Sequence, residues 1–158
     1  MFDDALLRLD TVEELSSRAK LVHAQYREVW PYQQRDFVHL SCWTVHSSGG
    51  VCVASRSLRD SSFLTQENSL RATLHLGGFY ISPLDETTED GEPMCNVCMI
   101  AHLSLAGVPS HPVNWLMNLA IPGMLTTIEK LLEEHEVSPE FTANFQLECA
   151  AVGRPDLC

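Results

Sequence analysis

Alternation of apolar and polar positions dominates the first two thirds of the chain and predicts β-strands. Between residues 19 and 29 two sets alternate: Val22, Ala24 and Tyr26 on one face, and His23, Gln25 and Arg27 on the other. Residues 36–46 also alternate but carry few charges, which predicts a strand covered on both faces. Residues 47–50, Ser-Ser-Gly-Gly, predict a hairpin turn into another strand at 51–58.

Two further segments have the same period. Residues 70–84 alternate as far as Gly77-Gly78, where the sequence predicts a bulge or a close approach of two backbones. Residues 93–105 alternate after a polar turn, whereas residues 8–15 fit a strand or a helix equally well. The middle of the chain is therefore predicted to be an antiparallel meander.

The period changes near the C-terminus. Apolar residues recur at helical spacing from residue 113 to residue 132, with Ser110 as a cap and Pro122-Gly123 as a kink. This pattern predicts one long helix across the sheet, whereas residues 136–158 show no period and are assigned as a tail of unknown role. The fold class is therefore α+β, a curved antiparallel sheet with a long C-terminal helix, in one domain over residues 1–135.

Composition narrows the possible functions. A chain of 158 residues that is 45% hydrophobic fits one domain, and its formal net charge of -11 argues against nucleic acid and against electrostatic adhesion to anionic lipid. Neither a signal peptide nor a run of 18 apolar residues occurs, so we expect a cytoplasmic protein. The six cysteines are then expected to be reduced and mostly buried.

No pattern of catalytic or metal-binding residues stands out. Cys95 and Cys98 have metal-ligand spacing, but on a strand they point to opposite faces and no second pair follows. The seven histidines are scattered, and no hydrolase or metalloprotease motif occurs. We therefore predict no catalytic residue, no metal and no cofactor.

Several short motifs together resemble one known family. They are Trp30-Pro31 with Arg35-Asp36-Phe37-Val38, Ser55-Arg56-Ser57, Leu70-Arg71-Ala72, Gly107-Val108-Pro109, and Ile121-Pro122-Gly123-Met124-Leu125. In this order and spacing, over residues 2 to 135, the chain resembles a START (StAR-related lipid transfer) domain, most of all the ceramide-transfer and phosphatidylcholine-transfer members. The resemblance implies a helix-grip fold. Because the family's first helix and strands lie upstream of the position of Phe2-Asp3, it also implies a domain truncated at the N-terminus, with an open sheet edge.

The resemblance implies non-catalytic transfer of a single lipid, a phospholipid, sphingolipid or sterol, between membranes. The loops at Trp30 and 106–109 would dock transiently on the bilayer through Trp30, Pro31, Val108 and Pro109. Alternation and resemblance together assign these residues to the lipid-binding cavity: Asp3, Val22, Ala24, Tyr26, Phe37, His39, Ser41, Trp43, Cys52, Ala54, His75, Val97, Met99, Ala101, Leu116 and Ala120. The same alternation would also suit a solid core.

Headgroup specificity is only partly retained. Ceramide-binding relatives place polar groups at the positions of Asp3, Ala24, Ala54 and Met99, and only Asp3 is polar here. Of the choline-caging aromatic positions, which match Ala24, Phe37 and His75, only Phe37 is clearly kept. This more apolar pocket suits a sterol, diglyceride or fatty acyl ligand as well as a phospholipid.

Two other functions stay open. A degenerate domain of this family would act as a protein-interaction or lipid-sensing module. An enzyme would use the same cavity, with His39 or His75 as its acid-base group.

Overall fold

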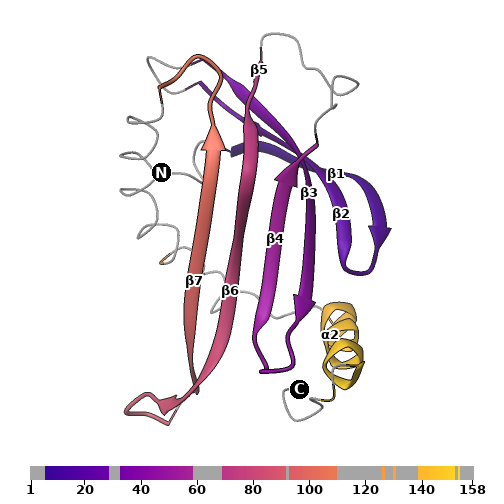
Figure 1. Ribbon diagram of the computed structural model, residues 1–158, viewed down its shortest axis with the longest axis vertical. Helices are drawn as coiled ribbons and strands as arrows, with labels where there is room; N and C mark the ends of the chain where they lie inside the picture. Colours follow the sequence, from indigo (N-terminus) through magenta and orange to yellow (C-terminus); the bar gives the residue numbers. More distant parts are fainter. Residues whose placement is uncertain are drawn as a thin grey trace.

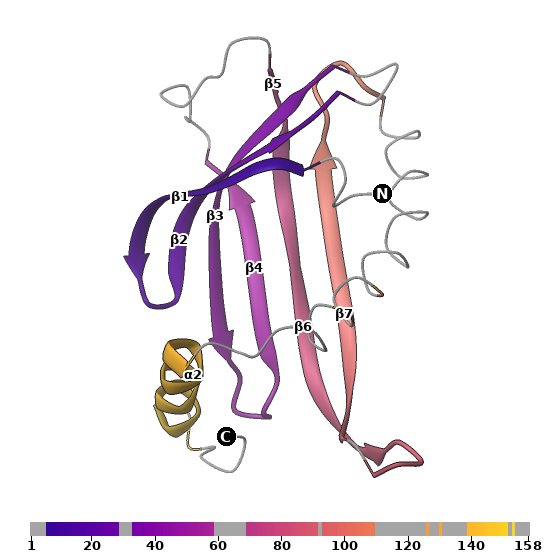
Figure 2. The same cartoon turned by 180° about the vertical axis from the view of Figure 1, so that it is seen from behind.

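The structure of the protein is a computed structural model that describes residues 6–28, 33–58, 69–91, 93–109, 126, 130, 139–151 and 153. Its elements are β1 (Leu6–Ser16), β2 (Ala19–Tyr26), β3 (Arg35–Val45), β4 (Val51–Ser57), β5 (Leu70–Arg71), β6 (Thr73–Thr87), β7 (Pro93–Ser104) and α2 (Pro139–Ala151). The strands form one sheet in the order β1-β2-β3-β4-β6-β7. Figures 1 and 2 show that β1 and β2 turn away from the direction of β6 and β7, so the sheet is twisted and curved.

The predicted antiparallel meander is confirmed, and the ambiguous segment at 8–15 belongs to a strand, β1. All neighbours in the sheet order pair antiparallel, and the short strand β5 pairs with β3 in parallel. The backbone amides of Leu70 and Ala72 donate to the carbonyl oxygens of Gln34 and Asp36, both at 2.9 Å. The sequence predicts that the strand ends at residue 84 and that a polar turn follows. In the structure β6 continues to Thr87, and the turn occupies residues 89–90.

A glycine allows β4 and β6 to approach closely. A Cβ atom on Gly78 would overlap the backbone carbonyl oxygen of Val53, so no larger residue fits there without movement of a strand. At Gly77, in contrast, a Cβ would meet only the flexible end of Leu74, 3.0 Å away. The expected close approach is therefore found at Gly78, while the irregularity in the β6–β7 register lies between Leu74 and Leu76.

The C-terminal region differs from the prediction in one respect. The expected long helix spans 113–132, of which the structure describes Thr126 and Lys130, both helical; the rest lies outside the described residues. The tail, to which the sequence assigned no element, contains the helix α2. Phe145 of α2 packs near Trp43 of β3, with ring centroids 6.5 Å apart, and Figures 1 and 2 show α2 beside that strand.

The core of the described part is centred on β2 and β3. Val38 is fully buried, and both Leu21 and Val22 are less than 8% exposed, so side chains on both sides of these strands are covered. The strand predicted at 36–46 is therefore found as Arg35–Val45, and it is covered on both faces near its start, whereas Cys42 and Thr44 further along are exposed. No helix among the described residues is long and apolar enough to cross a membrane.

The cysteines depart from the prediction of mostly buried thiols. Of those that the structure describes, Cys42, Cys95 and Cys98 are exposed, Cys52 is half-buried, and Cys149 on α2 is fully buried. All five are free thiols. Cys95 and Cys98 are both exposed although they face opposite sides of β7, because the described residues cover neither face of this last strand.

Candidate functional site

Strand register divides the side chains of the sheet between two faces. Partners in an antiparallel ladder point to the same side, so the register assigns faces directly. One face, which we call the Phe37 face, carries Val22, Ala24 and Tyr26 of β2, Phe37, His39, Ser41 and Trp43 of β3, Val53 and Ser55 of β4, Phe79 of β6, and Val97, Met99 and Ala101 of β7. The opposite side, which we call the Val38 face, carries His23, Asp36 and Val38.

The Phe37 face is apolar and unevenly covered. At the β2 end, Val22 and Ala24 are buried, and the rings of Tyr26 and Phe37 meet edge to face with centroids 5.7 Å apart. At the β7 end, Val97 is 39% exposed. The helix α2 lies on this same face, since Phe145 contacts Trp43 there. The Phe37 face is therefore mostly apolar, and it is open at the β7 end.

A small polar group interrupts this apolar surface. The hydroxyl of Ser55 donates to Oγ of Ser41 across the β3–β4 ladder at 3.0 Å. His39 lies two residues before Ser41 on the same face, and its Nδ1 is buried with no hydrogen-bond partner among the described residues. Burial lowers the pKa of His39 below its ordinary value of 6.5.

The register corrects two predicted cavity residues. Cys52 pairs with Thr44 and Ala54 with Cys42, so both lie on the Val38 face and not with Trp43 and Ser41. The hairpin loop causes the difference: His46 donates to the carbonyl of Gly50, leaving a loop of residues 47–49 between them. An odd loop length pairs odd-numbered residues with odd-numbered ones, whereas a turn over 47–50 would have placed Ala54 opposite Trp43. Val53 and Ser55 therefore occupy the predicted places.

A third predicted residue, His75, also lies elsewhere. It falls in the irregular part of β6, where its Nε2 is 2.8 Å from Oγ of Ser104 and its ring stacks on His102 with centroids 4.6 Å apart. His102 and Ser104 alternate onto the Val38 face of β7. The exposed His75, which was predicted to line the cavity, is thus separated by the sheet from Phe37.

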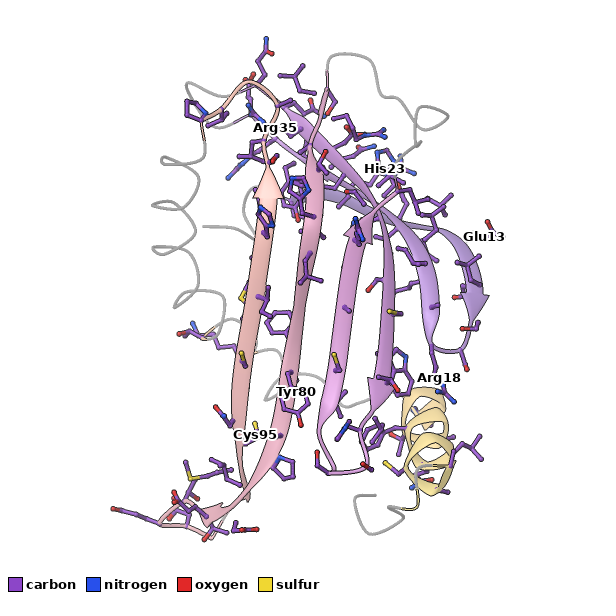
Figure 3. The ribbon with its side chains drawn as sticks, viewed as in Figure 1. Glu13, Arg18, His23, Arg35, Tyr80 and Cys95 are labelled. Atoms are coloured by element: carbon purple, nitrogen blue, oxygen red, sulfur yellow. The ribbon has the colours of Figure 1, made fainter. Side chains whose placement is uncertain are left out.

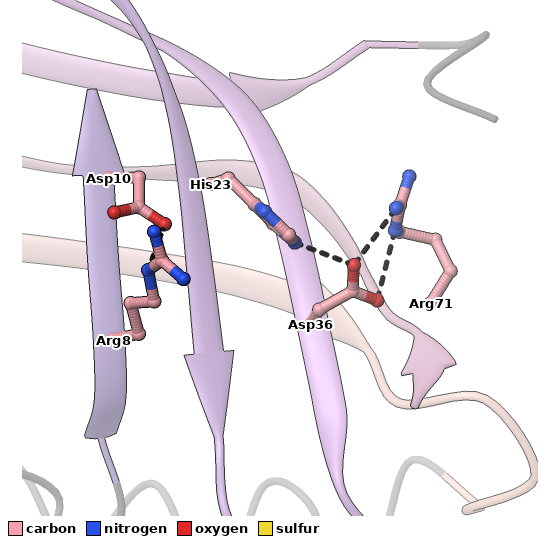
Figure 4. A network of polar contacts seen from close by, with 5 residues as sticks. All are labelled: Arg8, Asp10, His23, Asp36 and Arg71. Atoms are coloured by element: carbon pink, nitrogen blue, oxygen red, sulfur yellow. Dashed lines mark hydrogen bonds and ion pairs between the residues drawn. The ribbon is translucent and has the colours of Figure 1, made fainter. Parts of the chain in front are cut away.

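A buried ionic network lies on the Val38 face (Figure 4). Asp36, 2% exposed, accepts hydrogen bonds from Arg71 through both oxygens, at 3.0 and 2.8 Å, and its Oδ2 lies 2.8 Å from Nε2 of His23. Burial raises the pKa of Asp36, but the hydrogen bonds and positive charges of Arg71 and His23 outweigh this effect and hold it below 3.8. The network therefore joins β2, β3 and β5 at one point.

Arg35 connects this end of the sheet to the loop after β7. Its Nη1 donates to the carbonyl of Gln33 at 2.6 Å and its Nη2 to the carbonyl of Ala106 at 3.2 Å. Gly107 follows with φ of 76°, and Val108 is half-buried while Pro109 is exposed. Figure 3 shows Arg35 at the end of the sheet where this loop begins. The loop at 106–109 thus lies next to the residues that follow the Trp30 loop.

The remaining predicted site residues cannot be placed on this surface. Asp3, Trp30, Pro31, Leu116 and Ala120 lie outside the described residues. Within the described ranges, no group of three or more His, Cys, Asp or Glu side chains is arranged to hold a metal ion. Cys95 and Cys98 face opposite sides of β7, as predicted.

Comparison with known proteins identifies the family. The sequence model of the START domain matches residues 3–138, most of the chain. The chain belongs to the START domain family. Among curated proteins no sequence matches significantly.

Solved structures agree with this assignment at the level of the fold. Human STARD10 is 16% identical with a TM-score of 0.70, covering 99% of this chain and 60% of its own. Human StAR-related lipid transfer protein 5 is 15% identical with a TM-score of 0.69, covering 84% and 62%. The lipid transfer and protein localization domain of human StarD13 is 21% identical with a TM-score of 0.56, covering 68% and 52%. This START domain therefore has the helix-grip fold of lipid-transfer relatives and spans about three fifths of their length or less.

Proposed function

We propose that this START domain binds a single lipid against the Phe37 face and carries it between membranes without chemical change. The observation that carries the proposal is that the register gathers apolar side chains from β2, β3, β4, β6 and β7 on one face of the sheet, with polar side chains mainly on β3 and β4. Each CH₂ group moved from water to such a surface contributes roughly 0.8 kcal/mol, so acyl chains or a sterol ring system would be held there.

The ligand classes that fit are a phospholipid, a sphingolipid or a sterol. The described residues of the Phe37 face form no catalytic hydrogen-bonded pair: Nδ1 of His39 makes no hydrogen bond, and the hydroxyl of Ser55 bonds to that of Ser41. Non-catalytic binding is therefore the function that this surface supports best.

Membrane docking belongs to the same proposal. The hydrogen bond from Arg35 to the carbonyl of Ala106 holds the start of β3, which follows the Trp30 segment in the sequence, beside the loop at 106–109. Val108 and Pro109 in the second loop, together with Trp30 and Pro31 in the first, would enter the bilayer surface, where apolar and aromatic side chains are favoured. The protein would then be cytoplasmic and only transiently peripheral to membranes.

Replacing Val108 by Asp tests docking. A carboxylate at the bilayer surface costs free energy, so the rate of lipid transfer between phosphatidylcholine vesicles should fall at least fivefold while the unfolding midpoint changes little. Leu84→Asp is the matched control, because Leu84 is 41% exposed and lies near the β6–β7 hairpin at the other end of the sheet. Equal losses of transfer in both variants would contradict docking through this loop.

A second candidate function rests on β1. This strand ends the sheet order and exposes Leu7, Leu9 and Leu15, each by more than half of its surface. Such a surface suits a protein-interaction module. Protein that extracts no lipid from vesicles but self-associates in light-scattering measurements would favour this function over lipid transfer.

A further inference from the structure

The two outermost strands of the described sheet differ in how their free edges are built (Figures 1 and 2). β1 carries four charged side chains, Arg8, Asp10, Glu13 and Glu14. Its pairing with β2 also skips Leu7, Val12 and Leu15, so three bulges interrupt it. Charges and bulges are the usual devices that stop a free edge from pairing with another strand. β1 is therefore protected against strand pairing.

β7 lacks both protections. Its 12 residues include no Asp, Glu, Lys or Arg. Every residue from Cys95 to Ser104 has a partner in β6, and the extra residue at the irregularity, His75, belongs to β6, so this part of β7 is free of bulges. Apolar side chains on both faces are exposed, Ile100 by 52% and Val97 by 39%. A long, straight and uncharged edge of this kind readily pairs with a further strand.

These features also specify the partner. A strand added to β7 must bring no charge into the seam, be free of bulges over a similar length, and carry apolar side chains on both faces. Of the strands in the described sheet order, only β1 and β7 have a free edge, and β1 is charged and bulged. The strand that meets these conditions is therefore β7 of a second copy.

We propose that two copies of this chain pair antiparallel through β7. A twofold axis perpendicular to the sheet keeps both Phe37 faces on one side, so odd-numbered residues lie opposite odd-numbered residues. This condition centres the pairing on one residue, and the longest overlaps are centred on Cys98 or on Met99. In both, Val97, Met99 and Ala101 of the two copies meet on the Phe37 face. Each copy then covers the open β7 end of the other.

The acidic character of the chain does not oppose this arrangement strongly. The acidic residues described next to β7 along the chain are Asp85, Glu86, Glu89 and Asp90, in or beside the turn between β6 and β7. Because the two strands are antiparallel, the two turns lie at opposite ends of the pair, roughly 40 Å apart. This separation is several times the screening length of about 8 Å at physiological salt, so repulsion between the turns is weak.

Sedimentation velocity of the lipid-free full chain over a range of concentrations tests the pairing. We expect a reversible dimer. Cys98→Lys should weaken the dimer about tenfold, because the two lysines lie directly or diagonally opposite each other across the axis. Cys98→Ser is the neutral control at the same position and should leave the dimer unchanged. Ile100→Lys, on the same strand, is a second test if Cys98→Lys folds poorly.

Leu9→Lys is the matched control at the other edge of the sheet. Leu9 is 60% exposed on β1, so the same new charge there should leave dimerisation unchanged. Because Leu9 and Cys98 are both exposed, the urea midpoints of the two lysine variants should stay close to that of the wild type.

Thiol cross-linking tests the register of the seam. Cys98 residues of the two copies lie about 5 Å apart if the pairing is centred on Cys98 and about 8 Å apart if it is centred on Met99. A short bis-maleimide should therefore link two wild-type chains, and Cys98→Ser should lose most of that product. Cys42→Ser should keep the product, because the exposed Cys42 on β3 lies roughly 30 Å from its counterpart in the dimer.

Each outcome either supports or overturns the β7 dimer. A monomer at every concentration would overturn it. A dimer that Leu9→Lys dissociates and Cys98→Lys does not would place the interface on β1 and overturn it as well, as would equal cross-linking in Cys98→Ser and Cys42→Ser. Lipid extraction from vesicles is measured separately, so failure of the proposed lipid transfer and failure of the dimer are distinguishable.

Discussion

At the scale of single residues, the carboxylate of Asp36 joins three strands of the described sheet. It is buried, and it accepts hydrogen bonds from Arg71 and His23. Replacing Asp36 by Asn removes the buried negative charge to which Arg71 and His23 hydrogen-bond, so we expect a loss of about 3 kcal/mol in the free energy of unfolding. Asp10→Asn, in the exposed ion pair with Arg8, should cost less than about 1 kcal/mol. Urea titrations measure both, and equal costs would contradict the argument.

The same residue predicts how stability depends on pH. The pKa of Asp36 is lower in the folded protein than its ordinary value of 3.8, so as pH falls the unfolded chain takes up the proton first. Its contribution to stability is therefore present above pH 3.8 and is lost as pH falls through the lowered pKa. Urea midpoints measured from neutral pH to about pH 3 should decline less in Asp36→Asn than in the wild type. Parallel declines would show that other carboxylates dominate.

The sequence does not predict that Asp36, Arg71 and His23 contact one another. Arg35-Asp36 and Arg71 belong to motifs of the family pattern, and alternation assigns His23 to one face of its strand. Arg71 reaches Asp36 through the parallel pairing of β5 with β3, which has no periodic signal in the sequence because β5 is two residues long. Alternation assigns a residue to one face of a strand, but it does not predict which residue from a distant part of the chain will contact it there.

At the scale of secondary-structure elements, the pairing of β4 with β6 depends on Gly78. Gly78→Ala should destabilise the protein by roughly 2 kcal/mol, because the new methyl group meets the rigid backbone carbonyl of Val53. Gly77→Ala is the control on the same strand: its methyl group meets the flexible end of Leu74, and the cost should be below about 1 kcal/mol. Thermal or urea unfolding of both variants measures the difference. A larger loss at Gly77 would contradict the register.

The elements also show why some predictions failed. The strands were predicted well because alternation over seven or more residues is a strong signal, but the face of β4 depended on whether the preceding loop contains three or four residues. In α2 the residues Phe141, Phe145, Leu147 and Cys149 fall mostly two apart, a spacing that does not indicate a helix. Cys149 is fully buried while Leu147 is 69% exposed, so the positions of apolar residues along α2 do not predict which of them are buried.

At the scale of the whole molecule, family membership follows from the order of motifs along the chain, each of which is weak alone. The helix-grip fold was predicted from that order, and the match over residues 3–138 confirms the family. The sequence does not identify the ligand in the same way, because lipid selection depends on a few polar atoms whose surroundings no pattern of residues specifies.

The net charge of -11 leads to a prediction for the whole domain. If docking is apolar, the approach to an anionic membrane is opposed by repulsion of the whole protein, so transfer to vesicles containing phosphatidylserine should be slower than to pure phosphatidylcholine. Raising the salt concentration from about 0.01 M to about 1 M shortens the screening length from about 30 Å to about 3 Å, which should remove most of the difference. A fluorescent-lipid transfer assay measures both rates. Faster transfer to the anionic vesicles at low salt would instead require a cationic docking surface, which the acidic composition of this chain argues against.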